Sequence, residues 1–314
     1  IIQMLNYITL AVLLYLFFQN SPTTNRSMSQ IPLNWPWSNW MEIVLGTAQF
    51  GLDYGITNSS GMVPPDEVKA ILNYAANEGI NKLDTAQAYG DSEIVIGGYP
   101  HFDVMTKLTA NKLAPSTEKT ANVEQYLKES LLRLNRSSVY SVMIHDVEAI
   151  NFEAIIRCLR VLEQLKRDGT IGKVGVSLYT PEKLEEITAN FSVDIIQVPI
   201  NIFDQRFCST KIESIISEQG IDLYARSIFL QGSLLTSKTP KKLMEWDGEF
   251  KSYRQFCLAT KLSQMSCCLN FLQALGFVKG IVVGTTKLSE LKEIVDEFRL
   301  PMPKIDFRHL ASTE

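Results

Sequence analysis

Short runs rich in branched and aromatic residues alternate with amphipathic stretches along most of the chain, and this alternation constrains the fold more than any other feature. The runs lie at residues 42–48, 81–86, 103–108, 138–145, 172–178, 194–200, 221–227 and 280–286. Between them, apolar residues recur with helical spacing, for example Val123, Tyr126, Leu127, Leu131 and Leu134. Strands that alternate with helices are typical of a parallel sheet built from βα units.

Two architectures accommodate eight βα units. Residues 41–314 are close in number to the roughly 250 that a (β/α)8 barrel needs. An open, doubly wound sheet is the alternative, but no Gly-x-Gly-x-x-Gly turn follows the first strand. We therefore predict one α/β domain over residues 41–314, a (β/α)8 TIM barrel. Residues 232–255 exceed a normal βα connection, and we expect them to form a lid or pocket wall that carries Trp246 and Tyr253.

Residues 1–40 differ in composition from the rest of the chain. The segment 1–18 (IIQMLNYITLAVLLYLFF) is uncharged and just long enough to span a membrane, and residues 19–40 have the composition of a linker. A signal peptide fits poorly, because no basic region precedes the apolar run and no small-x-small site follows it. Two interpretations stay open. The segment is either a membrane anchor, or the reading frame was opened too early and translation naturally starts at Met41. The absence of Met at position 1 favours the second.

Charge and cysteine usage exclude several classes of partner. The chain has 30 Lys and Arg against 34 Asp and Glu, a formal charge of −4, so nothing attracts a polyanion and we expect no nucleic-acid partner. Five cysteines occur without any Cys-x-x-Cys spacing, which indicates reduced thiols and no metal site. We expect a cytoplasmic protein, with a membrane tether through residues 1–18 as the alternative.

Chemistry-bearing residues gather at the ends of three consecutive strands. The second strand ends in Asp84 and leads to Tyr89, the third ends near Lys107, and the fourth ends in His145. Active sites of (β/α)8 barrels form at this carboxyl end. A phenol is a poor acid until a nearby cation stabilises its phenolate, and Lys107, held by Asp84, could supply that charge. These groups suit proton donation to a carbonyl oxygen, with hydride from a bound cofactor.

Each of the four residues also has a purely structural interpretation. Asp84 could cap the next helix, Tyr89 could pack under a loop, Lys107 could be solvated and His145 could be a buried core imidazole. Their shared position at one barrel end is harder to explain by packing alone.

The segments that carry these residues resemble the aldo-keto reductase family. LDTAQAYGDSEIVIG (83–97) resembles the family signature around its catalytic Asp and Tyr, MTKL (105–108) its Lys strand, and SVMIHD (141–146) its His strand. Similarity extends to VLGTAQFG (44–51), GKVGVSL (172–178) and IIQVPIN (195–201). The resemblance implies reduction of an aldehyde or ketone, keto-sugars included, with Tyr89 as general acid. Lys107 and Asp84 would tune the acid, and His145 would shape the oxyanion site.

The same resemblance implies a set of cofactor contacts. Ser177 and Gln197 would hold the nicotinamide carboxamide, and backbone N–H groups at the start of the last helix suit a phosphate. The expected cofactor contacts are Thr47, Asp84, Ser177, Gln197, Arg226, Ser227, Phe229, Gln231, Gly284, Thr285, Thr286, Lys287 and Glu290. We expect Gln49, Phe50, Tyr54, Asp146 and Trp246 in the pocket wall.

Three positions depart from the family pattern. Leu178 replaces an Asn that contacts the carboxamide, and Arg226 replaces a Tyr that stacks on the nicotinamide in many members. Arg226 predicts either a preference for reduced cofactor or a rotated side chain that reaches the substrate. Glu290 stands where NADPH-preferring members often have Arg, whereas Lys287 nearby would attract a 2′-phosphate. NADPH is the expected cofactor, and NADH is the alternative.

Other functions stay open at this point. A barrel that binds NADP(H) without turnover, as a sensor or regulatory subunit, is one alternative. A lyase or isomerase with Lys107 as a Schiff-base amine is another, although a close Asp84 would keep that amine charged. The partner is expected to be a small carbonyl compound, and the sequence decides neither which one nor the oligomeric state.

Overall fold

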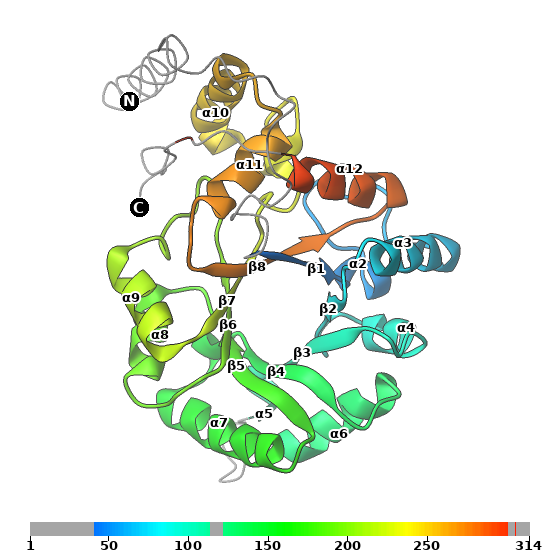
Figure 1. The fold of residues 1–314 in the computed structure, drawn as a ribbon, viewed down its shortest axis with the longest axis vertical. Coiled ribbons are helices and arrows are strands. Elements are labelled where there is room, and N and C mark those ends of the chain that lie inside the picture. The colour runs from blue at the N-terminus through cyan, green and yellow to red at the C-terminus, as the bar shows by residue number, and fades with distance from the viewer. Residues whose placement is uncertain (1–40, 114–121, 301–304, 306–314) are drawn as a thin grey trace, which may run out of the picture.

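Eight parallel strands form a closed barrel at the centre of the molecule (Figure 1). The computed structural model describes residues 41–113, 122–300 and 305. The strands are β1 (Glu42–Gly46), β2 (Lys82–Asp84), β3 (Asp103–Thr109), β4 (Val139–His145), β5 (Ile171–Ser177), β6 (Ile195–Pro199), β7 (Asp222–Arg226) and β8 (Val278–Gly284). Each pairs with the next in sequence, and β8 pairs with β1 from Glu42↔Gly280 to Gly46↔Gly284. The prediction of a (β/α)8 barrel is confirmed.

The predicted strand boundaries differ from the observed ones by at most two residues. The first run was expected to reach residue 48 and the last residue 286, but β1 ends at Gly46 and β8 at Gly284. The residues that follow are still β-branched or small, but they leave the hydrogen-bonded ladder and enter the loops at the carboxyl end. This is the end of the barrel where we expect the site.

Helices surround the barrel on its outside (Figure 1). They are α2 (Ala48–Gly51), α3 (Pro65–Asn77), α4 (Ser92–Gly97), α5 (Ala110–Leu113), α6 (Val123–Arg133), η2 (Val147–Ala149), α7 (Phe152–Arg167), α8 (Pro181–Thr188), α9 (Thr210–Gln219), η3 (Ser233–Leu235), η4 (Lys241–Trp246), α10 (Asp247–Thr260), α11 (Gln264–Gln273) and α12 (Leu288–Arg299). In α7, Ile155, Leu159 and Leu162 form a fully buried apolar face at helical spacing. Its first turn is capped by Asn151, whose side chain accepts a hydrogen bond from Ala154 N at 2.9 Å.

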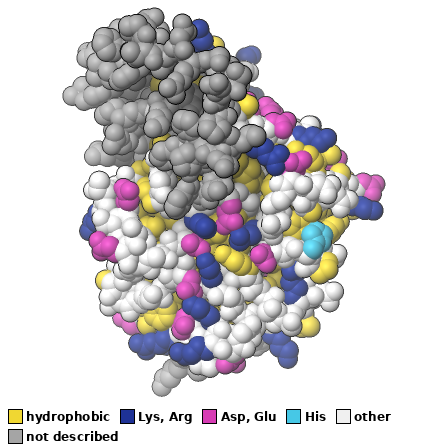
Figure 2. Space-filling view, in the orientation of Figure 1, with side chains coloured by type: hydrophobic (Ala, Val, Ile, Leu, Met, Phe, Trp, Pro, Cys, Tyr) yellow, Lys and Arg dark blue, Asp and Glu magenta, His cyan; other side chains and the backbone are white. Residues whose placement is uncertain are grey.

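The core has two parts. Inside the barrel, Val44, Met105, Met143, Ile195 and Tyr224 pack together, all with essentially no exposed surface. A larger apolar layer lies between strands and helices. Basic and acidic side chains intermingle over the face seen in Figure 2. The barrel is therefore a filled scaffold, and its open chemistry lies at the strand ends.

The expectation of a lid over residues 232–255 was only partly right. Gly232, Leu235 and Thr236 line the main cavity, but most of the segment folds into η3, η4 and the first part of α10. Tyr253 is 3% exposed and its hydroxyl donates to Gln264 O at 2.8 Å, so it is a core residue. Trp246, at the end of η4, is 46% exposed and does not line the cavity.

Residues 1–40 lie outside the described residues, so neither interpretation of that segment is tested. Within the described part of the chain, no helix combines the length and apolar character needed to cross a bilayer.

Candidate active site

A buried ion pair lies beneath the carboxyl end of the barrel. Lys107, two residues before the end of β3, has no exposed surface, and its Nζ lies 2.6 Å and 2.7 Å from the two carboxylate oxygens of Asp84. The same ammonium donates to Thr85 O at 3.0 Å. Asp84 also accepts from Gln197 Nε2 at 2.7 Å. Both charges are therefore paired and hydrogen-bonded, as a buried ion pair requires.

Tyr89 and His145 lie next to each other at the mouth. Their ring centroids are 5.9 Å apart and the rings are almost perpendicular, at 88°. The Nζ of Lys107 lies 5.2 Å from the Tyr89 ring centroid. Asp84 and His145 are the last residues of their strands, and Tyr89 lies in the turn before α4. The structure thus brings all four predicted catalytic residues to one place.

Ionisation at this site is governed mainly by burial. Burial raises the pKa of Tyr89 well above its ordinary value, and the negative charge of Asp84 raises it further. Burial lowers the pKa of Lys107, although Asp84 opposes that change. Burial, and then the charges of Lys107 and Arg226, lower the pKa of His145 to about 3. The pKa of Tyr89 is thus raised rather than lowered in this structure, and stabilisation of its phenolate by Lys107 stays a prediction.

A cavity of about 570 Å³ opens above these residues. Tyr89, His145 and Asp84 line it, whereas Lys107 lies behind Asp84 and does not. Twelve of the thirteen expected cofactor contacts line the same cavity, and the exception is Ser177. The Ser177 hydroxyl is buried and has no hydrogen-bond partner among the described residues. Ser177 pairs in register with Gln197, so the two expected carboxamide contacts are neighbours on adjacent strands.

The match to known proteins decides the family. The model of the Aldo/keto reductase family matches residues 42–314, which is the whole barrel. The chain belongs to the aldo/keto reductase family. Two relatives are an uncharacterised oxidoreductase, YqkF, of Bacillus subtilis (25% identical, covering 79% of this chain and 88% of that protein) and D-arabinose 1-dehydrogenase of Saccharomyces cerevisiae (22%, covering 82% and 83%).

Solved structures of the family share the fold. The holo form of the aldo-keto reductase AKR11C1 from Bacillus halodurans superposes with a TM-score of 0.69 at 19% identity and covers 86% of this chain and 90% of that one. Glycerol dehydrogenase AKR11B4 from Gluconobacter oxydans gives a TM-score of 0.63 at 22% identity, covering 83% and 87%. At these identities the likeness establishes the barrel alone.

Arg226 occupies an unusual position in this aldo-keto reductase. Its guanidinium carbon lies 4.2 Å from the ring centroid of Tyr179, on the loop after β5. Its Nη2 is buried and lacks a hydrogen-bond partner among the described residues. Arg226 is turned toward Tyr179, with a donor free for a ligand, and the two outcomes expected for it, a preference for reduced cofactor or contact with the substrate, stay predictions. Leu178 is fully buried, so its side chain offers no replacement for the family's Asn.

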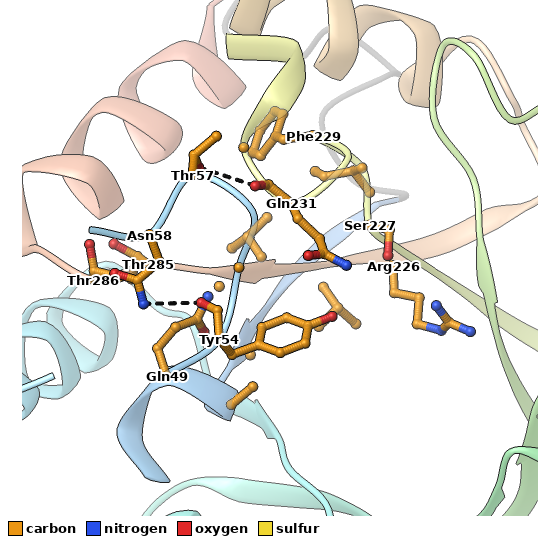
Figure 3. Close-up of a pocket in the computed structure, with 18 of the residues that line it drawn as sticks. Gln49, Tyr54, Thr57, Asn58, Arg226, Ser227, Phe229, Gln231, Thr285 and Thr286 are labelled. Atoms are coloured by element: carbon orange, nitrogen blue, oxygen red, sulfur yellow. Dashed lines mark hydrogen bonds between the residues drawn. The ribbon is translucent and has the colours of Figure 1, made fainter. Parts of the chain in front are cut away.

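Several cavity residues were not predicted from the sequence. Most of residues 54–60, between α2 and α3, lie along the cavity, and of these only Tyr54 was expected there. Thr57 Oγ1 donates to Gln231 O at 3.1 Å and so joins this loop to the loop after β7 (Figure 3). Met265 of α11 and Tyr179 were also missed, and nothing in their local pattern marks them as site residues. Phe50 and Trp246 were expected in the wall but do not line the cavity.

Proposed function

We propose that this chain reduces the carbonyl group of a small molecule with a nicotinamide dinucleotide, and that Tyr89 donates the proton. The observation that carries this proposal is the placement of a phenol and an imidazole side by side above a buried Lys107–Asp84 ion pair. A Schiff-base role for Lys107 is disfavoured, because the amine is sealed behind Asp84 and does not reach the cavity.

The ionisation states of these residues suit the proposed step. Because their pKa values are shifted as described, Tyr89 is protonated and His145 is neutral at physiological pH. A carbonyl oxygen between them would accept a hydrogen bond from each. As negative charge develops on that oxygen, Tyr89 releases its proton, and the ammonium 5.2 Å from its ring stabilises the phenolate that forms.

The cavity suits a nicotinamide dinucleotide. When bound, the nicotinamide would supply the hydride, which no side chain can provide. The unpartnered Ser177 hydroxyl and the neighbouring Gln197 amide have the hydrogen-bonding capacity that a carboxamide needs. Ser227, Phe229 and Gln231 would hold the dinucleotide along the loop after β7, which lines the cavity above the barrel (Figure 3).

We propose further that the substrate is hydroxylated, such as a keto-sugar. Asp146 and Arg226 both line the cavity near His145 and form no ion pair with each other. Tyr54 and Tyr179, which line the same cavity, are 41% and 42% exposed. An apolar substrate would bury both charges without partners, which is unfavourable. Hydroxyl groups can donate to Asp146 and accept from Arg226. The yeast relative, a D-arabinose dehydrogenase by name, agrees with this class.

Turnover measurements test the proposal directly. The full chain is incubated with NADH or NADPH and a panel of hydroxylated and unsubstituted aldehydes and ketones, with Tyr89→Phe as the control. We expect turnover, higher kcat/KM on the hydroxylated compounds, and a loss of at least about 10²-fold in kcat for Tyr89→Phe with cofactor binding retained. Binding without turnover would favour a non-catalytic sensor, and the absence of any dinucleotide binding would rule out both functions.

A further inference from the structure

We propose that two carboxylates, Glu290 and Glu67, make this reductase select NADH over NADPH, because they occupy the amides at the start of α12 that a 2′-phosphate would need. This inference rests on the proposed function, since it concerns which dinucleotide the same cavity takes. It reverses the expectation of NADPH that the sequence favoured.

Glu290 folds back over the start of its own helix. Its Oε2 accepts hydrogen bonds from Thr286 N at 2.7 Å and from Lys287 N at 3.2 Å. The hydroxyl of Thr286 donates to the same carboxylate at 3.1 Å, whereas the single hydroxyl proton of Thr285 has a shorter acceptor in Lys287 O, at 2.8 Å. The carboxylate of Glu290 therefore gathers three donors from the segment that the sequence predicted to bind a phosphate.

Glu67 reaches the same place from α3. Its Oε1 accepts from Leu288 N at 2.5 Å, across 221 residues of sequence. Three consecutive amides at the start of α12, those of Thr286, Lys287 and Leu288, thus all donate to protein carboxylates. Amides at a helix start favour anions, and here the protein supplies both anions itself.

The order of groups along the cavity places this carboxylate pair at the adenosine end. Tyr89 and His145 lie at the end that holds Arg226, whose charge acts on both, and this is where the nicotinamide must meet the substrate. Thr285 and Thr286 lie across the pocket from Arg226, with Gln231 between them (Figure 3). The loop that carries Gln231 lines the cavity between these two groups with Ser227, Phe229 and Gln231. The diphosphate therefore fits the loop, and the adenosine ribose fits the start of α12.

The negative charge at the start of α12 determines which dinucleotide can bind with its adenosine ribose there. NADPH differs from NADH only by a 2′-phosphate, which would meet the carboxylate of Glu290 in the cavity, with Glu67 holding the next amide of the helix start, against the ammonium of Lys287. To bind it, Glu290 would have to give up its hydrogen bonds from Thr286 and Lys287, each of the charge-assisted kind. The ribose hydroxyls of NADH can instead donate to the carboxylate of Glu290, which already lines the cavity.

Equilibrium binding of the two dinucleotides tests the inference without reference to turnover. Dissociation constants for NADH and NADPH are measured by fluorescence titration of the full chain, of Glu290→Gln and of Glu293→Gln. We expect NADH to bind at least about 10-fold more tightly than NADPH to the wild type, and Glu290→Gln to shift the ratio of dissociation constants toward NADPH by about 10-fold. Glu67→Gln should shift the ratio in the same direction.

Glu293 is the matched control. It lies one turn further along α12, is exposed and lines the cavity, but it accepts no hydrogen bond from the three amides at the helix start, which donate to Glu290 and Glu67. Glu293→Gln removes the same charge and should change the ratio less than about 2-fold, because exposed charges are screened. The glutamine at 290 keeps an acceptor for the amides, and an unchanged Tm verifies that α12 is intact.

The outcomes separate this inference from the proposed function. Equal affinities, or tighter NADPH binding by the wild type, would overturn the selection of NADH and leave the reductase proposal standing. An equal shift in Glu290→Gln and Glu293→Gln would overturn the local role of Glu290. Failure of both dinucleotides to bind would overturn the proposed function and this inference together.

Discussion

His145 shares the barrel mouth with two cations, Lys107 and Arg226, and its side chain is only 14% exposed. A proton on this imidazole would be desolvated and would lie close to other positive charges, so the folded protein excludes it. The residue is therefore a neutral hydrogen-bonding group, and its ionisation is coupled to stability. In the unfolded chain the same imidazole titrates near its ordinary pKa of about 6.5.

Acidification is expected to destabilise the fold through His145. Between its unfolded pKa of about 6.5 and its folded pKa of about 3, the unfolded state binds a proton that the folded state does not. The free energy of unfolding therefore falls as the pH falls below about 6.5, by about 2 kcal/mol at pH 5. Urea denaturation of the wild type and His145→Gln at pH 7 and pH 5 measures this. From pH 7 to pH 5, the free energy of unfolding should fall by about 2 kcal/mol less in His145→Gln than in the wild type. Identical decreases in the two proteins would show that the pKa of His145 is not lowered in the folded state.

At the scale of elements, the position of Tyr89 depends on how closely α2 approaches the turn before α4. A Cβ on Gly51 would lie 2.1 Å from Tyr89 O, and a Cβ on Gly90 would lie 2.3 Å from Gly51 O. The two backbones touch where both residues lack side chains. Gly90 also has a φ of +56°, which favours glycine. The phenol of Tyr89 is thus held by a backbone contact that no other residue type permits.

Gly90→Ala should therefore damage both stability and activity. The matched control is Gly79→Ala: Gly79 has a φ of +79°, but its Cβ would meet nothing within 4 Å. We expect Gly79→Ala to cost about 1–2 kcal/mol from backbone strain alone and to leave kcat unchanged. Gly90→Ala should cost at least about 1 kcal/mol more and lower kcat by about 10-fold or more, because it shifts Tyr89. Equal effects of the two substitutions on stability and kcat would contradict a close-packed α2–α4 contact.

At the scale of the whole molecule, the sequence predicted the barrel well and the chemistry of its mouth less well. Periodicity identifies strands because each buries a continuous apolar run, and strand ends then bring Asp84, Lys107 and His145 together by topology alone. Side-chain direction is not encoded in such patterns. Nothing in the local sequence shows that Glu290 folds onto its own helix start, or that burial raises the pKa of Tyr89. The burial of Tyr89 depends on residues distant in sequence, and the orientation of Glu290 depends on side-chain torsions that an apolar pattern leaves open.

The opposite end of the barrel carries a separate polar network. Tyr224 of β7 donates its hydroxyl to Glu42 of β1, and Lys82 of β2 lies 2.7 Å from the same carboxylate. Glu42 is the first residue of β1, so this network joins strands β1, β2 and β7 at their amino ends, away from the cavity. In a (β/α)8 barrel this end serves stability, and the carboxyl end serves function.

Because one end of the barrel serves stability and the other serves function, two Tyr→Phe substitutions are expected to have opposite effects: one should lower stability and the other should lower activity. Tyr224→Phe removes one hydrogen bond but leaves Glu42 paired with Lys82, so the free energy of unfolding should fall by about 1 kcal/mol while kcat/KM stays within about 2-fold. Tyr89→Phe should leave stability within about 0.5 kcal/mol, because its hydroxyl faces the cavity, and should abolish turnover. Urea denaturation and steady-state kinetics on both variants measure the two effects. A large loss of kcat/KM in Tyr224→Phe would show that the two ends of the barrel are coupled, since its hydroxyl bonds to Glu42 at the end away from the site.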